Sequence, residues 1–336
     1  MNNRISTLPV VVVIGATGAM GRPVVRHLLE STARRFRVRA LTRDPDSPSA
    51  RQLLALDPER VELVRGDTSD PASLAEAMRG ADGVFCNTDF WSSLSVETEY
   101  TQGLHALTAA ERAGVGLFVY ASLDPCAALS GGRLPVPHYD AKAAVAAHIS
   151  RRRSDEFMRK VEDGFYSKHV FVLVTGPYYE NLQFFFLPER GRLSDGREGY
   201  IFRMATGDRP FPMVALDDIA HFACAALVSP EKWGGRDLAV MSESLTIAEV
   251  ARTFERVTGQ PAEHQPLPLD VLRGSSPVGH DLANMHQFVQ EFGFQRDYEA
   301  LRRLHPALLD FAAWLKRTGW RGERQTVQKG PVTGEA

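Results

Sequence analysis

The sequence contains little cysteine and lacks any long apolar run. Its 336 residues include three cysteines, Cys86, Cys126 and Cys224. They do not have the spacing of metal ligands, which favours a reducing compartment and no metal site. No segment approaches the roughly 18–20 consecutive apolar residues that a membrane-spanning helix needs. Residues 9–14 are too few for the apolar core of a secretory signal peptide. We therefore expect a cytoplasmic protein without membrane contact.

An excess of charge of one sign is also absent. The formal net charge is −2, and hydrophobic and charged residues make up 44% and 24% of the chain, as in ordinary soluble globular proteins. The basic residues 151–153 and Lys160 stand among acidic residues, so we interpret them as a solvated face of mixed charge. These features predict no nucleic-acid partner.

A glycine-rich turn follows the first apolar segment. Residues 11–14 are apolar, as in a buried parallel strand, and GATGAMG at 15–21 leads into a helical pattern at 22–30. The spacing is G-x-x-G-x-x-G, which differs from the commonest dinucleotide fingerprint, G-x-G-x-x-G. Gly15 permits a tight turn, Gly18 lets a pyrophosphate approach the backbone, and Gly21 lets the helix pack closely on the strand. This context predicts a dinucleotide site with these cofactor contacts: Gly15, Thr17, Gly18, Ala19, Met20 and Gly21.

Strand and helix patterns alternate through the first half of the chain. Asp70 followed by Pro71 predicts a helix start, and Gly80 its end. Such alternation predicts a doubly wound α/β fold of Rossmann type, with a parallel sheet covered by helices on both faces. The predicted strands are 11–14, 36–42, 61–66, 81–87, 115–122 and 169–175, and the intervening helices include 49–57, 96–114 and 138–163.

The alternation stops after residue 176. We expect a nucleotide-binding domain over 1–176, and a smaller lid over 177–320 that is interleaved with it and contains helices near 217–230, 245–259 and 281–294. The polar, aperiodic residues 321–336 are expected to be disordered.

Ligands of such folds bind beyond the carboxyl ends of the strands. Arg43 follows the second predicted strand, where a basic residue would bind the 2′-phosphate of NADP. Asp44 follows at once and keeps NAD possible. Asp67-Thr68 could reach the adenine or open a turn into the next helix. Asn87-Thr88 would lie beside the pyrophosphate and ribose, and the following Trp91 could line the nicotinamide pocket or pack in the core.

The segment PVPHYDAKAAV, residues 135–145, holds the candidate catalytic residues. Short-chain dehydrogenases/reductases use Tyr-x-x-x-Lys, whose spacing places both side chains on one helix face. Here His138 stands four residues before Lys142, and Tyr139 only three. We expect Lys142 to bind the nicotinamide ribose, and His138 to act as proton donor, cap the helix or bind the substrate. Ser122 is placed like the serine that orients a substrate carbonyl beside the cofactor.

With these residues in view, the chain resembles the NmrA-like family of atypical short-chain dehydrogenases/reductases, especially its HSCARG branch of NADPH sensors. The resemblance covers about residues 9–316. It rests on the phrases GATGAMG, LTRDP, VRGDTSD, FVYASLD, PYYENLQFFFLP and DLANMHQFVQEFGF, and on the H-x-x-x-K of His138 and Lys142. It implies NADP(H) bound by the glycine turn, Arg43, Asp67-Thr68, Thr88, Lys142 and residues 178–181, including Tyr178, Tyr179 and Asn181. Residues 150–165 resemble an insertion relative to this family.

Two main functions are compatible with these features, and a cofactor-bound scaffold or vestigial reductase in a biosynthetic pathway is a third possibility. The first is an NADPH-dependent reductase of a small carbonyl, enone or quinone, in which His138, Tyr139 or water supplies the proton. Aromatic residues of the lid would then form the substrate wall: Tyr178, Tyr179, Phe184 and Phe185. The alternative is a redox sensor without turnover, whose lid reports NADPH to a protein partner. A homodimer is compatible with either function.

Overall fold

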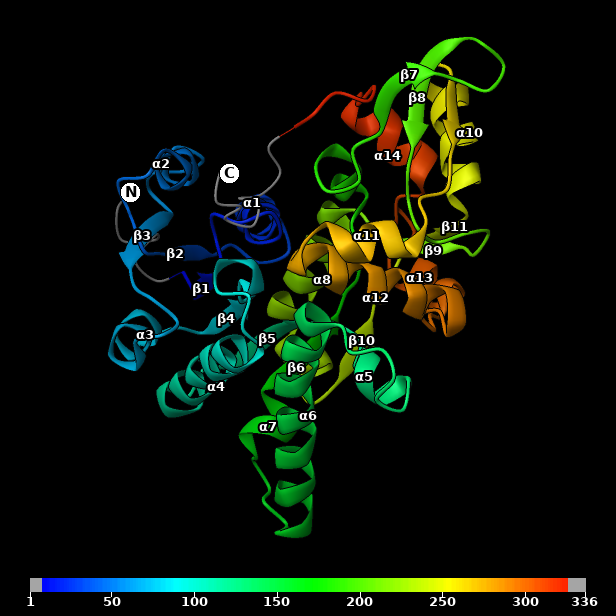
Figure 1. Cartoon of the computed structure of the whole chain (residues 1–336). Coiled ribbons are helices and arrows are strands. Elements are labelled where there is room, and N and C mark those ends of the chain that lie inside the picture. The colour runs from blue at the N-terminus through cyan, green and yellow to red at the C-terminus, as the bar shows by residue number, and fades with distance from the viewer. Residues whose placement is uncertain (1–7, 326–336) are drawn as a thin grey trace.

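A seven-stranded parallel sheet forms the centre of the molecule in a computed structural model that describes residues 8–325 (Figure 1). The strand order is β10-β6-β5-β4-β1-β2-β3, so the predicted doubly wound α/β fold is confirmed. The order reverses between β1 and β4, and ligands of such sheets bind beside that reversal. The strands are β1 (Val10–Ile14), β2 (Arg37–Thr42), β3 (Val61–Arg65), β4 (Gly83–Cys86), β5 (Leu117–Ser122), β6 (Val170–Val174) and β10 (Asp237–Ala239).

Side chains of β1 alternate between two hydrophobic cores. Val11 and Val13 belong to the core that contains Val24 of α1 and Phe222 of α8. Val12 and Ile14 belong to the core on the opposite face, which α3, α4 and α6 cover. Because both faces are covered, every residue of this strand must be apolar, and this explains the unbroken valine run.

The helices predicted in the first half are present, together with three short helices that were not predicted. They are α1 (Gly21–Glu30), α2 (Pro48–Leu54), α3 (Pro71–Met78), α4 (Val96–Ala113), α5 (Cys126–Leu129), α6 (Pro137–Met158) and α7 (Phe165–Lys168), with the short 3-10 helix η2 (Phe90–Ser92) before α4. The Asp70 carboxylate accepts a hydrogen bond from the Ala72 amide, as a capping residue should. Gly114, at φ 64°, ends α4 in the left-handed conformation.

Helix α6 is shorter than predicted, because it ends at Met158 and not near residue 163. Lys160 turns the chain with φ 53°. The Glu156 carboxylate then accepts hydrogen bonds from the amides of Tyr166 (3.0 Å) and Ser167 (2.7 Å), which draws α7 back against α6. The end of α6 extends beyond the rest of the sheet layer (Figure 1).

The second half of the chain, which we continue to call the lid, returns to the central sheet. Strand β10 pairs with β6, so the two halves are interleaved. Two small sheets, β11-β9 and β12-β8-β7, lie outside the main one. The remaining elements are η3 (Tyr179–Gln183), β7 (Glu189–Arg192), β8 (Glu198–Phe202), β9 (Phe211–Met213), α8 (Leu216–Val228), α9 (Pro230–Trp233), β11 (Glu243–Leu245), α10 (Ile247–Thr258), β12 (Ala262–His264), α11 (Leu269–Ser275), α12 (Pro277–Glu291), α13 (Tyr298–Leu304) and α14 (Phe311–Thr318).

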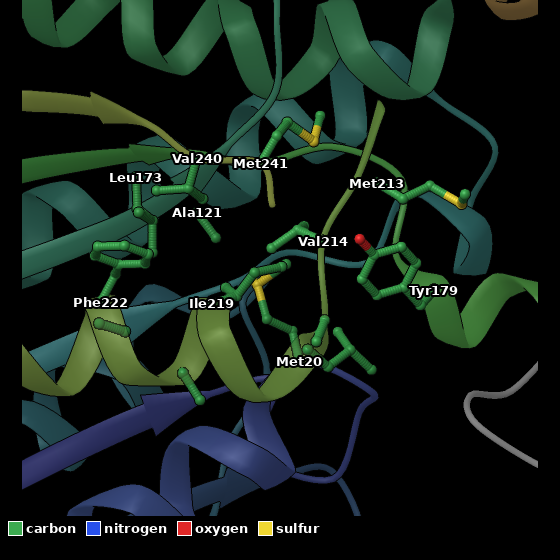
Figure 2. Close-up of a cluster of buried hydrophobic side chains, with 14 of the residues drawn as sticks. Met20, Ala121, Leu173, Tyr179, Met213, Val214, Ile219, Phe222, Val240 and Met241 are labelled. Carbon is green, nitrogen blue, oxygen red and sulfur yellow. The ribbon is translucent and has the colours of Figure 1, made fainter. Parts of the chain in front are cut away.

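The two halves share one hydrophobic core. Figure 2 shows Met20, which precedes α1, in the same buried cluster as Ile219 of α8 and Tyr179 of η3. A buried ion pair also joins the halves, since the Arg296 guanidinium donates two hydrogen bonds, of 3.0 and 2.6 Å, to the Asp124 carboxylate. The lid therefore packs on the sheet through a continuous interior.

The start of the predicted disordered tail is folded. The Trp320 indole donates to the carbonyl of Glu323 (2.7 Å), and the amide of Gln325 donates to the carbonyl of Gln183 (3.1 Å). The remaining tail residues, 326–336, lie outside the described residues. Within residues 8–325, no helix combines the length and apolar character needed to cross a bilayer.

Candidate dinucleotide and active site

The glycine turn before α1 has no room for side chains at its two ends. Gly15 has φ 77°, and a Cβ atom there would lie 2.6 Å from the Asn87 carbonyl oxygen. A Cβ atom on Gly21 would collide with the carbonyl oxygen of Gly15. The amide of Gly18 closes the turn by donating to that same oxygen at 2.9 Å. In the first turn of α1, Pro23 has no N–H, and the amides of Arg22 and Val24 donate to the carbonyl oxygens of Gly18 (3.1 Å) and Met20 (3.4 Å). The donors left for a pyrophosphate are therefore backbone amides of the turn itself, at the N-terminal end of the helix.

The other residues predicted in this turn divide into two groups. Thr17 and Ala19 are half-buried and lie on the turn itself. Met20 is only 3% exposed and packs in the core, as Figure 2 shows. Its backbone remains at the N-terminus of α1, whereas its side chain serves packing.

Arg43 lies exposed at the carboxyl end of β2. Arg65 of the neighbouring strand donates to its carbonyl oxygen at 2.9 Å, so two guanidinium groups occur at this corner. The Asp44 carboxylate is used locally, because it accepts the Asp46 amide at 3.0 Å. The corner thus combines the guanidinium groups of Arg43 and Arg65 with the carboxylates of Asp44 and its neighbour Asp46.

Asp67 begins a turn, which was one of its two predicted roles. Its carboxylate accepts the Ser69 amide at 2.8 Å, and its own amide donates to the Ser73 hydroxyl at 3.0 Å. The carbonyl oxygen of Thr68 lies 3.0 Å from His105 Nδ1 on α4. These contacts shape the loop after β3 and leave both residues half-buried.

Lys142 is held by groups of its own chain. Its Nζ lies within hydrogen-bond distance of Asn87 Oδ1 (3.2 Å), Thr88 O (2.7 Å) and Thr88 Oγ1 (3.0 Å). It also forms an ion pair with Glu99 Oε1 at 2.7 Å. An ammonium group has three protons, so these four acceptors saturate it. Asn87 therefore connects the glycine turn, through Gly15, with Lys142.

His138 lies one helical turn before Lys142 and is paired with a carboxylate from the lid. Its Nδ1 is 2.7 Å from Asp281 Oδ2 on α12, and both side chains are largely buried. The ring packs against Trp91, with 4.9 Å between the ring centroids. Trp91 in turn lies 5.6 Å from the ring of Phe185. Asp281 fixes the orientation of the imidazole, and aromatic rings line the site next to it.

Tyr139 and Ser122 are both buried. The Tyr139 ring is 2% exposed and stacks on Phe294 at 5.5 Å, and burial raises the pKa of this phenol well above its usual value. The Ser122 hydroxyl is fully buried, and it donates to the carbonyl oxygens of Leu123 and Lys142, both at 3.3 Å. Tyr139 therefore packs in the core, and Ser122 anchors α6 to the end of β5.

A sequence profile of the NmrA-like family matches residues 8–315, which is nearly the whole chain. The chain belongs to the NmrA-like family. An NmrA-like oxidoreductase of Cladobotryum sp, FrzB, is 29% identical over 325 residues, which cover 92% of this chain and 90% of that protein.

Two solved structures show the same fold as this NmrA-like chain. Triphenylmethane reductase of Citrobacter sp. is 19% identical, with a TM-score of 0.71 over 92% of this chain and 99% of the other. Quinone oxidoreductase QOR2 of Escherichia coli is 19% identical, with a TM-score of 0.65 over 92% of this chain and 100% of the other. At this level of identity, the comparison supports the fold alone.

The PYYEN segment of this NmrA-like chain contributes mainly to packing. Tyr178 is half-buried and packs against the main hydrophobic core. Burial, together with the Glu180 carboxylate, raises its pKa to about 12. Tyr179 is fully buried between Phe311 and Trp314.

The neighbouring residues 180 and 181 organise η3. Asn181 uses its backbone, since its carbonyl oxygen accepts the amides of Phe184 (3.1 Å) and Phe186 (2.8 Å). The Glu180 carboxylate accepts the Trp314 indole at 3.0 Å and the Leu216 amide at 3.1 Å. Burial raises the pKa of Glu180 to about 7. This segment therefore joins the sheet to α8 and α14.

Two of the three basic residues at 151–153 form specific contacts, whereas Arg151 is exposed. Arg153 pairs with Asp237 and donates to backbone carbonyls of both halves of the chain, and Arg152 pairs with Glu111. Arg153 thus connects α6 with β6 and β10 at the edge of the central sheet. Cys86 is fully buried, as predicted, and burial raises its thiol pKa to about 12.

Sequence reasoning missed Glu99, Arg65 and the role of Asp281. Glu99 stands in the first turn of α4, where a carboxylate is common because it favours the helix dipole. Asp281 belongs to DLANM, a phrase that indicated the family but not a partner for His138. Asp281 and His138 are 143 positions apart in the sequence, so only the folding of the chain brings them together.

Proposed function

We propose that the chain binds NADP(H) and reduces a carbonyl, enone or quinone of a small molecule. One observation carries this proposal: the Asn87 carbonyl lies against Gly15 of the glycine turn, its side chain contacts Lys142, and His138 stands one helical turn before Lys142 on the same face of α6. A dinucleotide cradle, a cationic side chain and a proton-carrying imidazole therefore lie side by side. The crystal structures of triphenylmethane reductase and QOR2 contain NADP(H) and NADPH, which supports the choice of cofactor.

The chain's residues fit this cofactor. The amides before α1 would hold the pyrophosphate, and the collision that any side chain at Gly21 would cause explains why the turn is bare. Arg43 and Arg65 would bind the 2′-phosphate at the corner of β2 and β3. Lys142 would contact the nicotinamide ribose, exchanging one of its present acceptors for a hydroxyl group. When bound, the cofactor supplies a hydride from its nicotinamide ring.

His138 is the group that would supply the proton. Its Nδ1 faces Asp281, so Nε2 is the atom left to exchange a proton with a substrate oxygen. The Asp281 carboxylate orients the ring and faces the positive charge that the ring carries when protonated. Lys142 is saturated, and Tyr139 is packed against Phe294, so neither competes for this role.

Trp91 and Phe185 favour a flat, apolar substrate. Their rings lie beside His138, and aromatic surfaces of this kind stack with conjugated molecules. In a conjugated enone or quinone the negative charge that follows hydride addition is delocalised, so a single imidazole donor suffices.

NADPH oxidation with a panel of quinones, enones and ketones tests this function. We expect turnover by the wild type, loss of most of it in His138→Gln, and retention in His148→Gln, a control on the same helix. Tight cofactor binding without turnover of any substrate would contradict the reductase and favour the sensor.

A further inference from the structure

Glu99 is a fully buried carboxylate directly behind the site. Its side chain is 0% exposed, and Oε1 receives both the Lys142 ammonium at 2.7 Å and the Thr88 hydroxyl at 2.6 Å. Oε2 has no hydrogen-bond partner among the described residues. A buried carboxylate is costly unless it is paired, so Glu99 and Lys142 stabilise each other as a neutral unit.

The position of the Lys142–Glu99 pair means that its net charge affects how the oxidised cofactor binds. Lys142 shares Asn87 with the glycine turn and lies one helical turn from His138, so the pair is at the reacting end of the proposed cofactor site. The nicotinamide ring carries a positive charge in NADP+ and none in NADPH. An unbalanced ammonium beside this ring would repel the oxidised form alone, because like charges interact strongly where water is excluded.

We propose that Glu99 is a positioning residue that balances the charge of Lys142, so that the site binds oxidised and reduced cofactor with similar affinity. This inference rests on the proposed function, because it requires the nicotinamide end of the cofactor to lie beside Lys142. It assigns Glu99 a role in exchanging NADP+ for NADPH between turnovers. It also explains why a buried carboxylate pairs with a lysine that Asn87 and Thr88 already contact.

The ratio of the dissociation constants for NADP+ and NADPH tests the proposal, because a purely structural defect weakens both forms together. Both constants are measured by titration calorimetry at one pH. Glu99→Gln keeps the shape of the side chain and removes its charge. We expect the ratio to rise about tenfold, equivalent to about 1.4 kcal/mol.

Two further variants make the test specific. Glu97 lies exposed in the same first turn of α4, so Glu97→Gln removes an equal charge and should leave the ratio within about twofold of the wild type. The double variant Glu99→Gln/Lys142→Met removes both members of the pair. Its ratio should return to within about threefold of the wild type, since replacing a buried ion pair by neutral groups restores neutrality.

A variant of opposite sign covers the case in which Glu99→Gln does not fold. Asn87→Asp adds a carboxylate 3.2 Å from Lys142 Nζ at almost unchanged shape, and should lower the ratio several-fold. Parallel losses for both cofactor forms in Glu99→Gln, or an unchanged ratio in Asn87→Asp, would overturn the role of Glu99 alone. A wild-type chain that binds neither form would overturn the proposed function as well.

Discussion

Replacing the buried histidine of the lid should stabilise the protein. His286 of α12 is 1% exposed and lies between Phe186 and Phe211, with ring centroids 5.5 and 5.6 Å away. Neither ring nitrogen has a hydrogen-bond partner among the described residues. Each unsatisfied buried polar group costs about 1–3 kcal/mol, whereas losing the aromatic contacts costs about 1 kcal/mol. We therefore expect His286→Leu, which is similar in volume, to raise the free energy of unfolding by about 1–2 kcal/mol at pH 7.

The stabilisation should grow in acid. Burial lowers the pKa of His286 from 6.5 to about 3. As the pH falls below 6.5, the unfolded chain takes up a proton that the folded chain cannot accept, so the wild type loses stability down to about pH 3. At about 1.36 kcal/mol per pH unit, the difference between variant and wild type should widen by about 2 kcal/mol from pH 7 to pH 5. The other histidines are the same in both proteins, so their contributions to the pH dependence of the free energy of unfolding cancel in the difference.

Urea denaturation at pH 7 and pH 5 measures this difference. His280 is exposed on the same helix, so His280→Leu should change the free energy of unfolding little at either pH. The reasoning would be refuted if His286→Leu were less stable than the wild type at pH 7, or if the difference were equal at the two pH values.

Three further predictions concern the candidate site. Arg43→Ala should weaken NADPH binding about tenfold or more while affecting NADH little, because a charge-assisted contact to the 2′-phosphate is lost; equal losses in calorimetry would contradict this assignment. Gly21→Ala should cost about 3 kcal/mol in urea denaturation and abolish cofactor binding, since its Cβ meets the Gly15 carbonyl; Gly274→Ala, with open space around its Cβ, is the control. Asp281→Asn should lower turnover about tenfold or more with cofactor affinity retained, and unchanged turnover in steady-state assays would remove Asp281 from the proton-donor arrangement.

The parts of the fold that depend on local chemistry were predictable. Strand β1 is buried on both faces, so all of its residues must be apolar. The glycines after it let backbone segments approach so closely that a Cβ atom would collide with them. Asp70 and Pro71 mark the start of α3 because capping is a contact between near neighbours. Strand β10 could not be found in this way, since three residues carry no periodicity and its pairing with β6 depends on tertiary structure.

The candidate site was predictable only where its residues belong to one segment. The spacing of His138 and Lys142 placed both on one face of α6, and the structure confirms that helix. Their partners come from elsewhere: Glu99 from α4 and Asp281 from α12. A lone acidic residue in an amphipathic helix is usually exposed, so no local pattern distinguishes these two from their solvated neighbours.

The lid contributes more to the site than a cover. Asp281 orients His138 across 143 residues of sequence, and Arg296 clamps Asp124 at the end of β5 across 172. Because the carboxylate that faces His138 Nδ1 is carried by α12, displacing that helix would deprive the imidazole of its orienting partner while leaving Lys142 and Asn87 in place. Proton donation should therefore depend on the packing of the lid, whereas dinucleotide binding depends on the sheet.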